Sequence, residues 1–367
     1  MIETPNFSGA PNLKELILRG CTRLSNIHAS LGNLKELIRL DLNGCKSLKS
    51  LPNKIGLEAL EIFDLGGCSR LKKFPEIVGN MSHLSKLYLN ETPIKDLPLA
   101  GEHVTGLIKL DLRDCKNLSS LPNACCSSMS LKILTLSGCS KIGELPENLR
   151  NLEGLEELDV SGTAIKMSPT SINLLKNHKV RSLHGCEGLS PKSSNKFIIF
   201  KQRRTPYPMV MLENSLSGLC SLTQLDLSFC NLQSIPDDIG CLSSLSYLNL
   251  GGNHFACLPE SMIQLSNLKS LWLSFCTSLR SLPKLPLNLD YIAARSCTSL
   301  EILLIGPDDE FVPAYNLVNC VKLIENQDYG DVVFAMLRRY LINGQVTLSI
   351  SLYVCLSLCI YVLHVQF

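Results

Sequence analysis

Leucines recur along the chain in a fixed alternation of apolar and polar positions. The string L-x-x-L-x-L-x-x-C begins at Leu13 and returns every 21 to 24 residues, except for one step of 44 residues. Its last position is held by Cys21, Cys45, Cys68, Thr92, Cys115, Cys139, Thr163, Cys186, Cys230, Asn253, Cys276 and Cys297. The eighth unit is degraded, with His178 and Arg181 where leucines stand elsewhere. Twelve units at one period indicate an internal repeat, in which every unit builds the same small structure.

The x-L-x-L segment of each unit has period two, which predicts a short strand with leucines pointing inward and the other residues outward. A second apolar pair follows and usually ends in Leu-Pro, as in Leu51-Pro52 and Leu145-Pro146. Proline cannot pair in a strand, so this side is expected to be irregular or a short helix. Because one unit cannot bury its apolar face alone, the units stack. The pattern predicts an α/β fold, a leucine-rich repeat solenoid (horseshoe) with a parallel concave β-sheet and an irregular or short-helical convex side.

The repeats also predict how the chain is divided. We expect a solenoid of about 12 units over residues 1–300, with a basic insertion at 187–212 that is either a solvated loop or a phosphate or partner contact. Residues 301–345 lack the repeat and carry an apolar stripe that predicts a helix over 331–342. Residues 346–367 contain no acid, lysine or arginine and are long enough to span a membrane. We interpret this apolar tail as read-through past a splice junction, with a genuine tail anchor as the alternative.

Composition narrows the functional classes. Leucine fills 70 of the 367 positions, and the formal net charge is +2. This balance excludes the strong basic excess of a dedicated nucleic-acid-binding protein, so no nucleic-acid partner is expected. The chain has 17 cysteines, an odd number, and shows no secretory signal at its start. Free thiols favour a reducing compartment, which predicts a cytoplasmic location.

Neither a metal site nor catalysis is indicated. Nine cysteines occupy the repeated turn position and no C-x-x-C spacing occurs, so we interpret these cysteines as buried packing residues. Phosphate-binding glycine loops, zinc-protease and kinase motifs are absent, and no cofactor is expected. Five aspartates share one outward strand position: Asp41, Asp64, Asp111, Asp159 and Asp226. Paired carboxylates could support acid–base chemistry, but a repeat consensus that faces solvent or basic side chains explains them better, and we predict that the chain is not an enzyme.

The repeats resemble those of one family of plant proteins. Units such as LKELILRGCTRLSNI, LIRLDLNGCKSLKSLP and LYLNETPIKDLP are similar to the leucine-rich repeats of intracellular immune receptors in which TIR and NB-ARC domains precede the repeats. The segment NLVNCVKLIENQ resembles the opening of the jelly-roll domain that follows the repeats in that family, so 301–345 is interpreted as its truncated start. The TIR and NB-ARC domains themselves are missing from this sequence.

The resemblance implies a protein-recognition module of plant innate immunity. Its partners would be a pathogen effector or a host guardee protein, together with the TIR and NB-ARC domains of a complete receptor, in the cytoplasm or in both nucleus and cytoplasm. Two alternatives stay open. The chain could be a membrane-anchored or extracellular repeat receptor, with a membrane partner only if the apolar tail is genuine, or it could be a non-immune repeat adaptor.

Solenoids present their outward strand residues to partners, so the sequence predicts the binding face directly. We expect the binding residues to be Tyr88, Tyr247, Asn249, Lys269, Trp272 and Tyr291. Exposed aromatic residues are enriched among binding hot spots because they bury a large area at low entropic cost. The alternative is that Trp272 and Tyr291 pack against the segment after the repeats.

Overall fold

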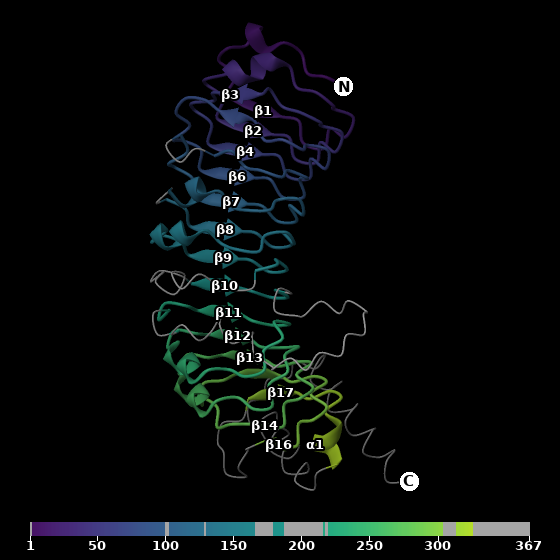
Figure 1. Ribbon diagram of the computed structural model, residues 1–367, viewed down its shortest axis with the longest axis vertical. Coiled ribbons are helices and arrows are strands. Elements are labelled where there is room, and N and C mark those ends of the chain that lie inside the picture. The colour runs from purple at the N-terminus through teal and green to yellow at the C-terminus, as the bar shows by residue number, and fades with distance from the viewer. Residues whose placement is uncertain are drawn as a thin grey trace, which may run out of the picture. The chain divides into compact units, whose positions relative to one another are not determined.

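The computed structural model forms two compact units, residues 1–199 and 200–367, each a stack of similar coils (Figure 1). The residues that it describes are 2–99, 103–127, 130–165, 179–186, 216, 219–303 and 313–325. The helix expected at 331–342, the apolar tail at 346–367 and the insertion at 187–212 lie outside these residues. Within the described residues, no helix is long and apolar enough to cross a membrane.

The first unit is organised around a parallel sheet of three-residue strands. Its strands, in spatial and sequence order, are β1 (Glu15–Ile17), β2 (Arg39–Asp41), β4 (Ile62–Asp64), β6 (Lys86–Tyr88), β7 (Lys109–Asp111), β8 (Ile133–Thr135), β9 (Glu157–Asp159) and β10 (Val180–Ser182). Each strand pairs in register with the next, so that Leu40 lies beside Phe63 and Leu87 beside Leu110. Strands β3 (Lys54–Ile55) and β5 (Glu76–Ile77) form a second, two-stranded parallel sheet. The parallel solenoid expected from the period-two pattern is therefore confirmed.

The second unit repeats this architecture. Its sheet contains β11 (Gln224–Asp226), β12 (Tyr247–Asn249), β13 (Ser270–Trp272), β15 (Tyr291–Ala293) and β17 (Ala314–Asn316). Strands β14 (Ser281–Leu282) and β16 (Ile302–Leu303) pair separately, and the helix α1 (Val321–Glu325) follows the last coil. Strand β17 and Cys320 extend the repeat one coil beyond residue 300, where the sequence pattern placed its end. The step of 23 residues from Cys297 to Cys320 carries that signal in the sequence, but Tyr315 replaces the inward leucine.

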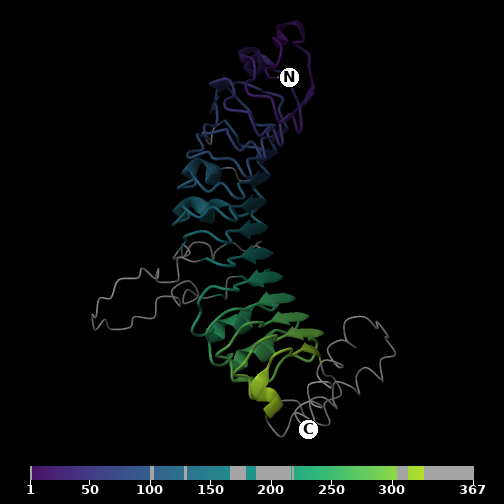
Figure 2. The same ribbon diagram turned by 90° about the vertical axis from the view of Figure 1, so that its right-hand side faces the viewer.

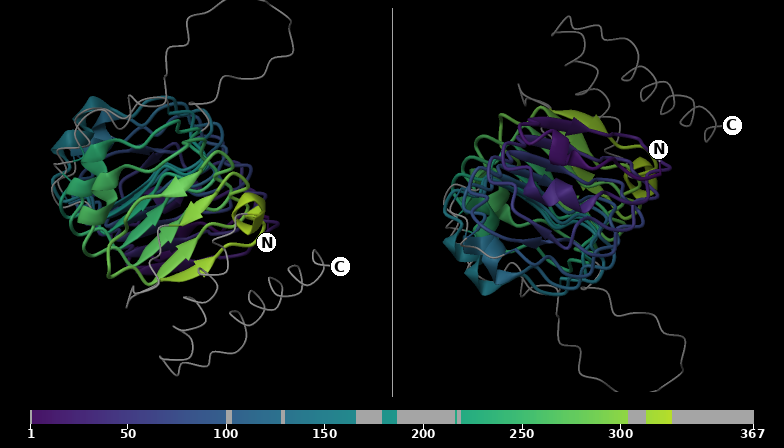
Figure 3. Two further views of the ribbon diagram at one scale, coloured as in Figure 1. Left: turned by 90° about the horizontal axis from the view of Figure 1, so that it is seen from below. Right: turned by 90° about the horizontal axis from the view of Figure 1, so that it is seen from above.

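Short 3-10 helices form the side of the coils that faces away from the strands (Figure 2), and the view along the stacked coils shows the same separation (Figure 3). The described helices are η1 (Phe7–Gly9), η2 (Ala29–Asn33), η3 (Asn123–Ser127), η4 (Glu147–Asn151), η9 (Asp237–Cys241) and η10 (Glu260–Gln264). Pro146, Pro236 and Pro259 are the N-cap residues of three of them, each in an extended conformation. Proline ends the preceding extended segment at these positions and lacks the N–H that a helix start would leave unpaired. The short-helical convex side expected from the Leu-Pro pairs is confirmed.

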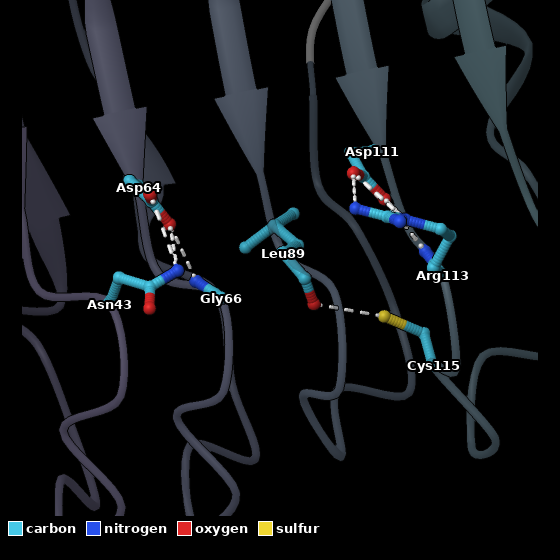
Figure 4. A network of polar contacts seen from close by, with 7 residues as sticks. All are labelled: Asn43, Asp64, Gly66, Leu89, Asp111, Arg113 and Cys115. Carbon is cyan, nitrogen blue, oxygen red and sulfur yellow. Dashed lines mark hydrogen bonds and ion pairs between the residues drawn. The ribbon is translucent and has the colours of Figure 1, made fainter.

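The core is a column of inward side chains joined by a ladder of polar contacts. Leu40, Phe63, Leu87 and Leu110 are completely buried. The residue at the last position of the repeated string, here called the ladder residue, in most coils donates a hydrogen bond to a carbonyl of the preceding coil, as Cys115 Sγ does to Leu89 O at 3.1 Å (Figure 4). The other thiols that do so belong to Cys45, Cys68, Cys139, Cys186, Cys276, Cys297 and Cys320. These cysteines are buried structural residues, as the spacing predicted. Thr92 and Thr163 donate instead to a carbonyl of their own coil.

Asparagine serves the same ladder position in one coil. Asn253 is completely buried, its amide nitrogen donates to Leu227 O and Leu250 O, and its carbonyl oxygen accepts from the backbone N–H groups of Cys230 and Leu232. Because the asparagine amide contains both donors and an acceptor, it forms hydrogen bonds with the backbone of its own coil and of the preceding coil. Cys, Thr and Asn alternate in the sequence because each is small and able to hydrogen-bond at this point.

The degraded eighth unit keeps its strand despite a charged residue at the inward position. Arg181 lies at the middle of β10, in register with Leu158, and is only 4% exposed. Burial lowers the pKa of its guanidinium to about 10. Removing a cation from water is costly, so this coil gains less from stacking than its leucine-filled neighbours do.

We expect truncation of a buried leucine in the middle of the first unit to destabilise the stack. Leu112 is completely buried directly after β7, and Leu112→Ala should lower the free energy of unfolding by ~2–5 kcal/mol, because it removes apolar contacts and leaves a cavity. Urea unfolding followed by circular dichroism measures the change. The control is Lys116→Ala, at an exposed side chain. An unchanged midpoint for Leu112→Ala would contradict the register described above.

The thiol ladder should make stability fall at alkaline pH. Burial raises the pKa of Cys45 from 9.0 to about 11 and that of Cys68 to about 12. Above pH 9 the unfolded chain therefore binds fewer protons than the folded chain, and the free energy of unfolding decreases by up to ~1.4 kcal/mol per pH unit for each such thiol. Urea unfolding between pH 9 and about pH 11 should show this slope. The variant Cys45→Ala/Cys68→Ala should have a shallower slope, whereas Cys241→Ala, at an exposed thiol, should leave the slope unchanged.

Candidate functional site

The outward aspartates of the strands close the turns that follow them. The Asp64 carboxylate accepts a hydrogen bond from the Gly66 backbone N–H at 2.9 Å and two from the Asn43 side chain (Figure 4). The same contact, from a strand-end Asp to the N–H two residues later, occurs at Asp41, Asp111, Asp159 and Asp226. Asp and Asn favour this local turn because their short side chains reach the backbone. The aspartates are thus turn-forming residues of the repeat.

Two of these aspartates lie against basic side chains, which is one of the two surroundings expected from the sequence. Asp41 and Asp111 are 1% and 2% exposed, although their strand position faces outward. Each is paired with an arginine, Arg39 at 3.1 Å and Arg113 at 2.7 Å, whose side chains lie over the carboxylates. The hydrogen bonds that the Arg113 guanidinium donates to the Asp111 carboxylate raise the pKa of this guanidinium. At Asp41 and Asp111, the turn N–H and the neighbouring arginine thus both bond to the carboxylate oxygens.

Aromatic side chains gather on the sheet face of the second unit. The ring centroid of Trp272 lies 6.3 Å from that of Tyr247 and 5.7 Å from that of Tyr291, with the second pair edge to face. Strand register explains this grouping, because Tyr247, Ser270 and Tyr291 stand side by side while Trp272 lies next to Ala293. The indole therefore reaches both tyrosines across neighbouring coils. We call Tyr247, Trp272 and Tyr291 the aromatic cluster.

The aromatic cluster is accessible. Trp272 is 38% exposed, and both tyrosines are partly exposed. Partial burial, followed by the nearby Asp226 carboxylate, raises the pKa of the Tyr247 hydroxyl, so this hydroxyl remains protonated and can donate a hydrogen bond at neutral pH. The cluster offers flat apolar area together with hydrogen-bonding edges, which is the composition typical of protein-binding hot spots.

The other expected binding residues lie in different surroundings. Asn249 forms a strand-end turn, accepting from Gly251 N–H and donating to Asp226. Lys269 precedes β13, and its ammonium donates to the Asn288 carbonyl at 3.2 Å. The Asn249 side chain also forms a hydrogen bond with the Tyr247 hydroxyl, which partly offsets the rise in the pKa of that hydroxyl. Asn249 adjoins the cluster through its register with Trp272, while Lys269 contributes to a neighbouring loop.

Tyr88 lies in the first unit, where its neighbours are charged side chains. It stands between Asp64 and Asp111 in register, and the Lys109 ammonium lies 5.6 Å from its ring centroid. Burial, and then the two carboxylates, raise the pKa of its hydroxyl. The six residues expected from the sequence thus form one aromatic cluster with an adjacent asparagine, and two separate positions.

The structure exposes two aromatics that the sequence analysis did not single out. Phe229 and Phe275 are 52% and 49% exposed, and their ring centroids are 6.4 Å apart. Both stand directly before the ladder residue, and both have a positive φ, 56° and 67°. The repeated string S-F-C in LDLSFC and LWLSFC carried this signal, since glycine holds that position in most other units.

The sequence of this chain matches two family models. One, leucine-rich repeats of the disease resistance protein RPS4B-like type, matches residues 56–144, and the other, leucine rich repeat, matches residues 214–277. Among solved structures, the chain is similar to the leucine-rich repeat protein LIC12759 of Leptospira interrogans, with 23% identity and a TM-score of 0.58 over 80% of this chain and 69% of that one. The functional domain of InlJ from Listeria monocytogenes, which includes a cysteine ladder, has 14% identity and a TM-score of 0.51 over 84% and 63% of the two chains. These two likenesses support the fold.

Plant proteins are more similar in sequence to this chain than these two solved structures are. The TMV resistance protein N of Nicotiana glutinosa is 38% identical over 294 residues, which cover 79% of this chain and 24% of that protein. The disease resistance-like protein DSC1 of Arabidopsis thaliana is 39% identical over 327 residues, which cover 88% of this chain and 25% of that protein. The chain thus spans about a quarter of the length of these relatives. It is a leucine-rich repeat protein, related over most of its length to plant disease-resistance proteins, as its repeat motifs predicted.

Proposed function

We propose that this chain is a protein-recognition module of plant immunity and that the sheet face of its second unit binds a pathogen effector or a host guardee protein. The observation that carries the proposal is the exposed aromatic cluster of Tyr247, Trp272 and Tyr291 in a chain related to disease-resistance proteins. Stacked strands supply a rigid base for these rings, so little ordering is needed when a partner binds.

Local composition supports a protein partner. The rings lie on consecutive coils, β12, β13 and β15, and form a continuous surface with an indole at its centre. Tryptophan and tyrosine dominate the energetics of protein interfaces, whereas clustered cations would be expected for a nucleic-acid surface. The proposal assigns the chain no catalytic step and no cofactor.

We also propose which other domains the module works with and where in the cell it is found. The relatives are four times longer than the matched region, so TIR and NB-ARC domains of a full-length receptor are proposed as additional partners. A cytoplasmic location, with a nuclear pool, follows from the resemblance of the repeats to those of intracellular receptors. We also propose that the solenoid, which extends through Cys320, is followed by a post-repeat segment up to residue 345 and by an apolar tail at 346–367.

Removal of the aromatic cluster should abolish recognition without unfolding the chain. The measurement is the binding of the purified chain to a panel of purified bacterial and oomycete effectors by biolayer interferometry. For an effector that binds, Trp272→Ala and Tyr247→Ala should each weaken Kd at least tenfold, equivalent to about 1.4 kcal/mol, because each removes a large apolar contact. Lys86→Ala, at an exposed side chain on β6 of the first unit, is the control and should leave Kd unchanged.

Thermal melts of the same variants separate recognition from folding. An unchanged melting midpoint with lost binding supports the proposal. A lowered midpoint for Trp272→Ala would instead assign the cluster to packing against the segment after the repeats. Full binding by both aromatic variants would place the recognition site elsewhere.

A further inference from the structure

Strand β1 is the first strand in the sheet of the first unit, and it is paired on one side only. β2 lies beside it in parallel register, with Glu15 next to Arg39 and Ile17 next to Asp41. Among the residues that the structure describes, no strand pairs with the other edge of β1. Such an edge presents backbone N–H and C=O groups that can pair with an incoming chain.

The contacts between the first two coils show which backbone groups this edge presents. On β2, the groups of Arg39 and Asp41 point to the first coil, because Arg39 N–H donates to a carbonyl there and Asp41 O accepts from Leu18 N–H at 2.8 Å. Glu15 and Ile17 occupy the equivalent positions of β1, so their N–H and C=O groups point away from β2. Within the described ranges, no hydrogen bond reaches these groups from that side.

The inward side chains of the first coil are less covered than those of the second. At four equivalent positions the first residue is partly exposed and the second is completely buried: Leu13 and Leu37, Leu16 and Leu40, Leu18 and Leu42, Cys21 and Cys45. The Cys45 thiol donates to Leu18 O at 3.2 Å, whereas the Cys21 thiol has no acceptor in the part of the chain that the structure describes. An added strand with inward leucines would cover this apolar edge and supply the missing carbonyl.

The opposite side of the first coil is already covered. Ser25 N–H donates to Ile2 O at 2.7 Å, Thr4 N–H donates to Asn26 O at 3.4 Å, and Phe7 in η1 is buried. Residues 2–12 thus stack on the irregular side of the coil as the same part of another coil would. The edge of β1 therefore accommodates one extended strand, whereas a complete coil from a second copy of the chain would collide with residues 2–12.

The outward side chains give this edge a defined charge pattern. Glu15 and Arg19 are exposed and form no ion pair among the described residues, and Ile17 between them is 50% exposed. In a parallel pair, each outward residue of an added strand lies about 5 Å from its equivalent on β1. Opposite charges at neighbouring positions stabilise strand pairing and like charges oppose it. The edge therefore favours a strand with a basic residue beside Glu15 and an acid or amide beside Arg19.

We propose that the outer edge of β1 is a strand-addition site for a leucine-containing segment of another polypeptide. The segment lies parallel to β1, and its two leucines, spaced two residues apart, pack on Leu16 and Leu18. Its backbone accepts a hydrogen bond from Glu15 N–H and donates one to Ile17 O. The inference goes beyond the proposed function and does not depend on it, because this edge belongs to the first unit and the aromatic cluster to the second.

A synthetic peptide with the sequence of residues 37–44, LIRLDLNG, is the probe. It has two leucines two residues apart, an arginine at the first outward position and an asparagine at the last. Fluorescence anisotropy measures its Kd for the full chain, and hydrogen exchange followed by mass spectrometry reports on the amides of residues 13–19. We expect saturable binding and slower exchange in this segment. The control peptide LIRDDDNG, which lacks the inward leucines, should not bind.

Two variants of the chain test the register. Ile17→Pro removes an outward N–H that the fold leaves unpaired and should weaken binding about tenfold with little change in the melting midpoint, because proline is tolerated at a sheet edge. Glu15→Lys should weaken binding about threefold, and the peptide LIELDLNG, with glutamate at the first outward position, should restore it. Glu157→Lys is the matched control, because Glu157 is exposed at the same position of β9, a strand paired on both sides, and should leave Kd unchanged.

Several outcomes overturn the inference. These are absence of peptide binding, binding without slower exchange at residues 13–19, and equal binding of the peptide that lacks leucines. Self-association of the wild-type chain that Ile17→Pro abolishes also overturns it, by assigning the edge to a second copy. If Ile17→Pro fails to fold, the charge exchange between Glu15→Lys and the glutamate peptide decides. Trp272→Ala should bind the peptide as the wild type does, so loss of effector binding in that variant leaves the strand-addition site untouched.

Discussion

Hydrogen bonding between neighbouring coils is the interaction on which the whole molecule depends. Strands of three residues satisfy few of their own polar groups, so the ladder continues past their ends, as when Leu42 N–H donates to Asp64 O and Gly44 N–H to Gly66 O. The thiol of Cys68 then donates back to Leu42 O. A single coil leaves these groups unpaired and its leucines in water, and only stacking removes both costs.

This constraint divides the residues of a coil into two classes. The inward side chains and the ladder residue recur in every described coil, and a strand-end Asp or Asn, such as Asp64 or Asn249, closes the turn in several of them. The first strand residue projects from the surface and can vary with little effect on stacking, whereas the residue before the ladder position has a positive φ that favours glycine. The coils therefore differ mainly in the side chains at these surface positions. In the second unit, these positions include Tyr247, Tyr291, Phe229 and Phe275.

The two units use the same scaffold differently. On the first, Arg39, Lys109 and Arg113 lie beside carboxylates or over the Tyr88 ring, so charges are neutralised within the face. Such exposed or half-exposed pairs contribute little to association. On the second unit, rings replace the ion pairs, and apolar area remains available to a partner. A common backbone thus supports one face on which charged side chains pair with one another and one face with exposed aromatic rings.

The sequence alone determined the repeat, its register, the parallel strands and the structural role of the cysteines, because the hydrogen bonds and burial of each coil recur at a fixed period. The sequence also placed Tyr247, Trp272 and Tyr291 on the outward face of the sheet, because alternation along a strand assigns each residue to a face. Only the tertiary structure showed which of these rings are in contact and that the aspartate carboxylates accept hydrogen bonds from the turns that follow them. It also showed that the repeat continues through Cys320. The repeated string S-F-C in the sequence pointed to Phe229 and Phe275, but only the structure showed that their side chains are exposed. Their placement depends on a left-handed backbone and on the Phe229 ring lying over a glycine in the next coil, and one-dimensional periodicity carries no information about contacts between coils.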